Sequence, residues 1–106
     1  MPPEGTSGTH FVSSGVVEFR ELLRRHIREL EDERPAEQST DWFFLRYLRR
    51  LQRRALAQPR ARDYEGLMRG LTRFYVDHVE EGSALAERFE DILETHRYAL
   101  RRDHAG

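Results

Sequence analysis

The side chains in this sequence that could do chemistry are histidines and glutamates at helical spacing. His26 precedes Glu29 by three residues, and His78 precedes Glu81 by the same interval. Residues at i and i+3 share a helix face, so each pair could present a nitrogen and a carboxylate in one direction. Helical bundles build metal sites from inward-facing histidines and carboxylates on facing helices. The candidate metal ligands are therefore His26, His78, Glu81 and His96.

The same residues give the chain a partial resemblance to hemerythrin-like metal-binding bundles, carried by the runs LLRRH, DHVEEG and ILETH. The resemblance implies a helical bundle with histidine and carboxylate ligands. The sequence departs from the family pattern, because Gly82 follows His78 by four residues and Leu100 follows His96 by four. We therefore interpret these histidines first as hydrogen-bonding residues at the edge of the core, and keep metal binding as an alternative.

A second short resemblance covers residues 78–84, HVEEGSA, which is similar to the histidine-bearing helix of histidine phosphotransfer domains. In that family a lysine follows the histidine by three residues and a glycine by four. Here Gly82 fits, but Glu81 replaces the lysine and places a negative charge beside the position of a phosphate. We interpret this short match as chance.

Enzyme chemistry has little support in the rest of the chain. There is no cysteine, which removes thiolate nucleophiles, thiolate metal ligands and disulfides together. No glycine-rich phosphate loop is present, and the serines have no meaningful spacing from histidine or aspartate. We predict that the protein is not an enzyme and needs no cofactor.

The most strongly patterned stretch runs from Trp42 to Arg62, with seven arginines and no acidic residue. Its apolar residues recur at spacings of four, three and four, which places them on one face of a helix. The other face carries arginines with aromatic residues among them. The apolar positions are Phe44, Leu48, Leu51 and Ala55. The predicted partner-binding residues are Trp42, Phe43, Arg46, Tyr47, Arg49, Arg50, Arg53 and Arg54.

Arginine and large aromatic residues are enriched at protein–protein hot spots, so we expect this face to bind a protein partner, as a homo-oligomer or within a larger complex. Nucleic acid bound through residues 46–62 is the alternative, because clustered arginines with aromatics can contact phosphates and bases. The net charge of −1 and the pI of 6.5 argue against a dedicated nucleic-acid binder. A third interpretation is internal: the acidic stretches 29–41 and 77–94 could neutralise the arginines.

The elements that must position these residues are helices. The chain has 106 residues, of which 35% are charged and 38% hydrophobic, as suits one small all-α bundle. We expect four helices, or three if the last two are continuous through Gly82. A flexible arm (1–13) precedes a single bundle domain (14–102), and 103–106 form a frayed tail. With no signal-like or membrane-spanning segment in the sequence, we expect a cytoplasmic protein with no membrane partner.

Local signals place the ends of these helices. The first helix is expected to start near Ser14 or Gly15, Ser39 or Thr40 to cap the second, and Ser83 to cap the fourth if the chain breaks at Gly82. Pro35 and Pro59 favour helix ends before them. Asp63 is the expected cap of the third helix. The expected inward stripe of that helix is Leu67, Leu71, Phe74 and His78. For the first helix the expected stripe is Val16, Phe19, Leu23, Ile27 and Leu30, and for the last it is Leu85, Phe89, Ile92 and His96.

Overall fold

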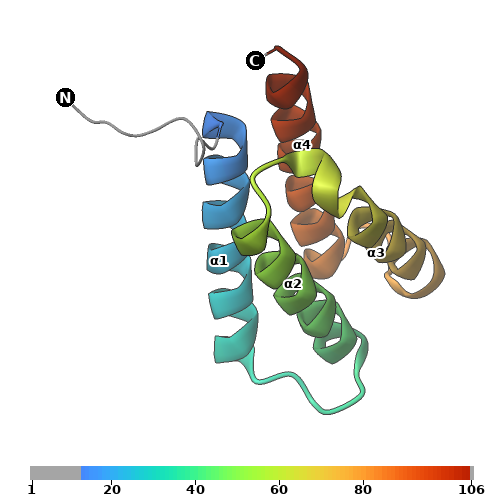
Figure 1. The fold of residues 1–106 in the computed structure, drawn as a ribbon. Coiled ribbons are helices and arrows are strands. Elements are labelled where there is room, and N and C mark those ends of the chain that lie inside the picture. The colour runs from blue at the N-terminus through green and yellow to red at the C-terminus, as the bar shows by residue number, and fades with distance from the viewer. Residues whose placement is uncertain (1–12, 106) are drawn as a thin grey trace.

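The computed structural model describes residues 13–105 and shows an all-α protein, with 84% of those residues helical and no strand among them (Figure 1). The expected four-helix bundle is confirmed. The helices are α1 (Ser14–Glu33), α2 (Thr40–Ala57), α3 (Glu65–His78) and α4 (Ala84–Ala105), with a short 3-10 helix, η3 (Ala61–Tyr64), before α3. Apart from Ser13, the predicted flexible arm lies outside the described residues.

Three serines set the starts of the long helices by accepting a hydrogen bond from a backbone N–H of the first turn. Ser13 Oγ accepts from Val16, Ser39 Oγ accepts from Trp42, and Ser83 Oγ accepts from Ala86 at 3.1 Å. Gly82 separates α3 from α4 at φ +79°, a left-handed conformation that glycine adopts without a steric penalty. The break expected at Gly82 is therefore present.

The ends of α3 and α4 differ from the sequence-based expectation. Asp63 does not cap α3, because it lies inside η3 and the capping position belongs to Tyr64. Helix α3 already ends at His78, and 79–83 form the connection to α4. Helix α4 continues to Ala105, so residues 103–105 extend the helix where we expected a frayed tail.

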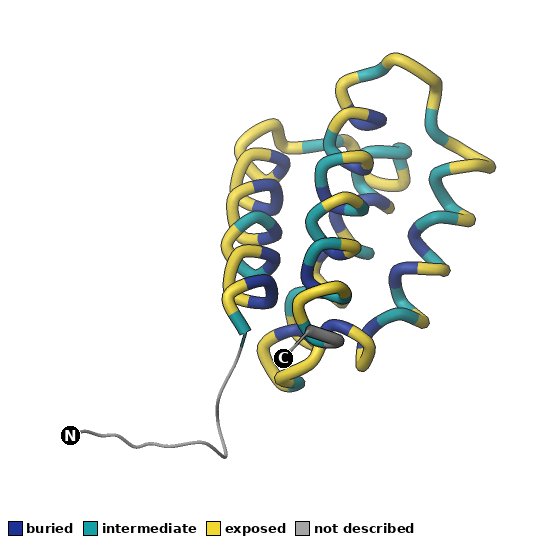
Figure 2. Tube along the Cα trace, turned by 90° about the horizontal axis from the view of Figure 1, so that it is seen from above, coloured by how far each residue is buried: buried dark blue, intermediate teal, exposed yellow. Residues whose placement is uncertain are grey.

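Helix α1 packs along both α2 and α4, and α3 lies at the edge of the bundle with fewer neighbours. Each long helix turns its buried side inward (Figure 2). The core consists mainly of the apolar stripes expected for α1, α2 and α4, including Phe19, Leu23, Phe44, Leu48, Phe89 and Ile92. Gly15 allows α1 and α4 to approach closely, since a Cβ there would lie only 2.8 Å from Ala99 Cα.

The expected stripe of α3 is partly wrong. Leu71 is fully buried, Leu67 and Phe74 are half-buried and pack against the core, and His78 is exposed. Two residues outside the expected stripe also face inward: Met68 is buried, and the half-buried Tyr75 ring stacks on Phe89 at a centroid distance of 4.1 Å. The expected stripe differs from the observed one because α3 lies at the edge of the bundle, where only a narrow strip of its surface is covered by neighbouring helices.

Candidate functional site

The sequence-predicted partner residues lie on the side of α2 that turns away from the core. Phe44, Leu48 and Leu51 are fully buried on the opposite side. All five predicted arginines are exposed, Phe43 is 41% exposed, and Trp42 and Tyr47 are half-buried. We call this set the α2 outer face: Trp42, Phe43, Arg46, Tyr47, Arg49, Arg50, Arg53 and Arg54.

Aromatic and guanidinium groups contact one another on the α2 outer face. The Trp42 and Phe43 rings meet edge to face, with centroids 4.9 Å apart. Arg46 Cζ lies 4.9 Å from the Trp42 ring centroid, and Arg50 Cζ lies 5.7 Å from that of Tyr47. These distances suit cation–π attraction. A stacked guanidinium still has its in-plane N–H donors free for a carboxylate or phosphate. Arg46 and Arg50 are therefore held in place and can still form hydrogen bonds with a partner.

A small groove of about 330 Å³ opens on this face beside the aromatic pair. Its lining residues are Gln38, Trp42, Phe43, Arg46, Tyr47 and Arg50. A second groove of about 480 Å³ continues from Tyr47 across to α3. There the Tyr47, Phe74 and His78 rings follow one another at 5.5 and 5.0 Å, and Arg69 and Arg73 flank them.

Gly70 of α3 lies in the second groove beside Tyr47, and a Cβ there would make an ordinary van der Waals contact at 3.5 Å from Tyr47 Cε1. This contact could not be predicted from the sequence, because it requires knowing that α3 packs beside α2. The surface around Trp42 is therefore wider than α2 alone.

Acidic residues of the described part of the chain neutralise little of the positive charge between Trp42 and Arg62. Among the described residues, only one of the seven arginines between Trp42 and Arg62 forms an ion pair, Arg49 with Glu31 at 2.9 Å. Of the acidic residues in 77–94, only Asp91 forms an ion pair within the described part of the chain, and its partners lie on α1. Apart from Glu31, which pairs with Arg49, the acidic stretches therefore do not neutralise the α2 outer face by direct contact among these residues.

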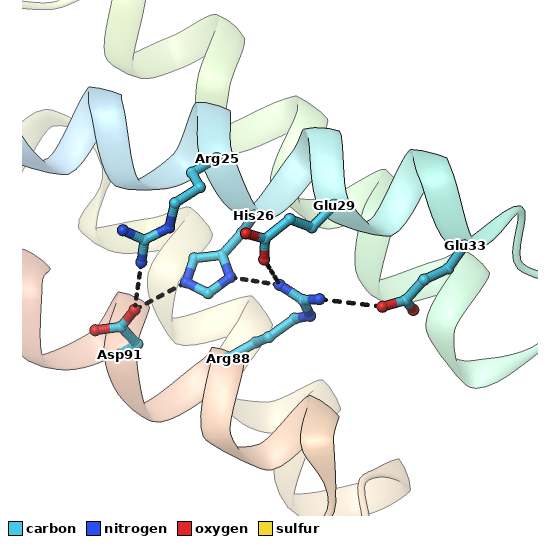
Figure 3. Close-up of polar contacts among 6 residues, drawn as sticks. All are labelled: Arg25, His26, Glu29, Glu33, Arg88 and Asp91. Carbon is cyan, nitrogen blue, oxygen red and sulfur yellow. Dashed lines mark hydrogen bonds and ion pairs between the residues drawn. The ribbon is translucent and has the colours of Figure 1, made fainter.

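The acidic residues of α1 serve another purpose, a polar network with α4 around His26 (Figure 3). Arg88 of α4 donates to Glu29 at 2.7 Å, to Glu33 at 3.1 Å and to His26 Nδ1 at 2.8 Å. Because an arginine is always protonated, Nδ1 must accept, and Nε2–H must donate to Asp91 Oδ2 at 2.9 Å. His26 is thus held as the neutral Nε2–H tautomer, with both nitrogens occupied.

The same network sets the charge state of one of its acids. The hydrogen bond from Arg88 is the largest cause that holds the pKa of Glu29 below its usual value. The arrangement ties α1 to α4 and has no nitrogen available for a metal or for proton transfer.

The four candidate metal residues do not come together. His96 is buried and its Nε2–H donates to the Ala61 carbonyl at 3.0 Å, and burial lowers its pKa. His78 is exposed beside Phe74, and Glu81 is exposed in the turn before α4. Within residues 13–105, no group of three or more histidine, aspartate or glutamate side chains is arranged to hold a metal ion.

A structural junction near the end of α4 was missed by sequence reasoning. Asp103 accepts a hydrogen bond from Ala61 N at 2.6 Å and another from Ser13 Oγ at 3.4 Å. Arg20 donates to the carbonyls of Ala55 and Gln58 at 2.8 and 3.1 Å, which fixes the end of α2. These contacts close the turn that leads from α2 into η3.

Tyr64 fills the space between that junction and the core. Its ring stacks on Phe19 at 5.4 Å, and its hydroxyl is buried without a hydrogen-bond partner among the described residues. Burial raises the pKa of this phenol. Tyr64 is therefore a packing residue and carries no reactive group toward the surface.

The described residues include no helix with the length and apolar character that a membrane span requires. Comparisons with protein-family models, curated proteins and solved structures find no match for this chain.

Proposed function

We propose that this chain is a non-enzymatic interaction module whose α2 outer face docks on an acidic surface of a protein partner. The observation that carries the proposal is the exposed Phe43 edge against Trp42, bordered by arginines that stack on aromatic rings and form no ion pair among the described residues. An aromatic anchor surrounded by charged donors is the composition found at the centres of protein interfaces.

The two kinds of residue contribute differently to such an interface. Truncating a central aromatic anchor typically costs about 2 kcal/mol or more of binding free energy. Exposed arginine contacts contribute only about 0–1 kcal/mol each and weaken with salt. The arginines instead select an acidic partner and speed its approach. Because Trp42 already holds Arg46 by stacking, less side-chain entropy is lost on binding.

Nucleic acid bound through residues 46–62 is the second candidate. Its support is that six of the seven arginines in this stretch form no ion pair among the described residues, which leaves them available to phosphates. The pI of 6.5 and the many acidic residues elsewhere in the chain favour a protein partner over nucleic acid.

The test is a binding titration with labelled probes at two salt concentrations. One probe is a tryptophan-free model peptide that forms an amphipathic helix with glutamates on one face, and its glutamine counterpart is the control. The other probes are random single-stranded and duplex oligonucleotides. The proteins are the wild type, Trp42→Ala, and the fourfold variant with alanine at Arg49, Arg50, Arg53 and Arg54.

For a protein-docking face, the glutamate peptide binds and Trp42→Ala weakens it about 30-fold, the equivalent of 2 kcal/mol. At the higher salt concentration, where exposed ion pairs are screened, the fourfold variant then loses less affinity for the peptide than Trp42→Ala does. Tight oligonucleotide binding that falls steeply with salt and disappears in the fourfold variant would favour the second candidate and overturn the proposal.

A further inference from the structure

A second charged surface lies on α4. Glu87, Glu90 and Glu94 are all exposed and share one face of the helix, and none of them forms an ion pair among the described residues. They line a groove of about 590 Å³ together with His26, Ala84, Arg88 and Asp91. We call this surface the acidic groove.

The acidic groove and the α2 outer face have opposite charge. The α2 outer face presents the partly exposed Phe43 ring with arginines around it and a smaller groove beside it, and the acidic groove presents a larger hollow with carboxylates around it. Arg46, Arg50 and Arg53 are exposed and form no ion pair among the described residues. With Arg54, which is also exposed and unpaired among those residues, the α2 outer face offers four cations to the three unpaired carboxylates of the groove.

The two surfaces do not meet within one chain. Helix α1 packs against both α2 and α4, and no ion pair links α2 with α4 among the described residues. The acidic groove also needs a rigid floor to accept a side chain, and the hydrogen bonds of His26 to Arg88 and Asp91 supply it (Figure 3). Complementary surfaces that cannot satisfy each other in one molecule can do so between two.

We propose that the partner of the α2 outer face is a second copy of this chain, whose acidic groove receives Phe43 and whose Glu87, Glu90 and Glu94 pair with Arg46, Arg50 and Arg53. The inference rests on the proposed function and names its partner. The contact joins two different surfaces, so after the first contact one copy still has a free acidic groove and the other a free α2 outer face. Such head-to-tail contacts continue into rings or open chains of copies.

The test is light scattering on the full chain over a range of protein and salt concentrations. Two variants remove one surface each: the groove variant E87Q/E90Q/E94Q and the face variant R46Q/R50Q/R53Q. The matched control is E18Q/D32N/E37Q, which changes three exposed acids outside the groove by the same charge. Far-UV circular dichroism checks that every variant keeps the helical content of the wild type.

The expected result is that the wild-type mass rises with protein concentration beyond that of two copies and falls with added salt. The groove variant and the face variant each stay monomeric at concentrations where the control variant assembles like the wild type. Mixed in equal amounts, the two variants form a dimer and nothing larger, because the mixture contains only one compatible pair of intact surfaces. An arrangement with two identical surfaces in contact does not give this result.

A wild type that stays monomeric at every concentration and low salt would overturn the inference, and so would a groove variant that assembles like the wild type. This outcome is distinguishable from failure of the proposed function. If the monomeric protein still binds the glutamate peptide through Trp42, the docking face stands and its partner is a different acidic protein. If the protein stays monomeric and also fails to bind the glutamate peptide, both proposals are wrong.

Discussion

Phe43 and Phe44 are adjacent phenylalanines on α2 with opposite surroundings, and we predict that alanine substitution separates them sharply. Phe44 is fully buried in the core, whereas Phe43 is 41% exposed and meets the Trp42 ring edge to face. The same change at two consecutive positions keeps side-chain size and helix propensity constant. The pair therefore tests whether α2 has one face for the core and another for a partner.

The magnitudes follow from burial. Replacing a buried phenylalanine by alanine costs about 3–5 kcal/mol, because a cavity is added to the lost transfer energy. Full burial of a phenylalanine contributes roughly 1.5–3 kcal/mol, so a half-buried ring whose removal leaves no closed cavity contributes about 1 kcal/mol. We expect Phe44→Ala to lower the free energy of unfolding by about 2–4 kcal/mol more than Phe43→Ala.

The assay is urea unfolding of both variants and the wild type, followed by far-UV circular dichroism. The midpoint for Phe44→Ala should fall strongly at an unchanged denaturant slope, and that for Phe43→Ala should move little. Phe43→Ala should nevertheless weaken binding of the glutamate peptide. Equal losses of stability in the two variants would mean that Phe43 is a core residue, and the case for a docking face would lose its main support.

Three further predictions concern the packing of the bundle. Tyr64→Phe should leave the free energy of unfolding in urea unchanged or raise it by up to about 1 kcal/mol, because it removes a buried hydroxyl with no partner among the described residues; a large loss would reveal an unseen partner. Gly15→Ala should lower the thermal midpoint, because the new Cβ would lie 2.8 Å from Ala99 Cα. Burial lowers the pKa of His96, so the unfolded chain binds more protons than the folded one, and stability should fall as pH drops below about 6.5. His96→Gln should flatten this slope in urea titrations at several pH values, and an unchanged slope would assign it to other groups.

The core of three helices was predictable because their apolar residues repeat with a helical period over many turns. All of Phe19, Leu23, Phe44, Leu48 and Ile92 are fully buried as expected. Such a stripe can be recognised from the sequence of one helix alone, without knowing which other helices pack against it. The starts of α2 and α4 were predictable for a similar reason, since a serine cap contacts a backbone N–H only three residues away.

Features that depend on two distant segments were not predictable. Asp103 and Ala61 meet only because α4 continues to Ala105 beside η3, and nothing near Asp103 in the sequence signals that contact. The buried side of α3 was partly wrong because its place at the edge of the bundle decides which residues are covered. The helical period alone was enough to predict which residues of the candidate site are exposed. Predicting that most of its arginines form no ion pair would have required the positions of all neighbouring acidic residues.

The fluorescence of Trp42 during titration with the glutamate peptide tests the central claim most directly. Trp42 is the only tryptophan in the chain and lies on the α2 outer face, so its emission reports on that surface alone. If a protein surface covers this face, the emission should shift to shorter wavelength and saturate, and Phe43→Ala should require a higher peptide concentration. An unchanged emission while the labelled peptide is bound would show that the partner docks elsewhere and would contradict the account.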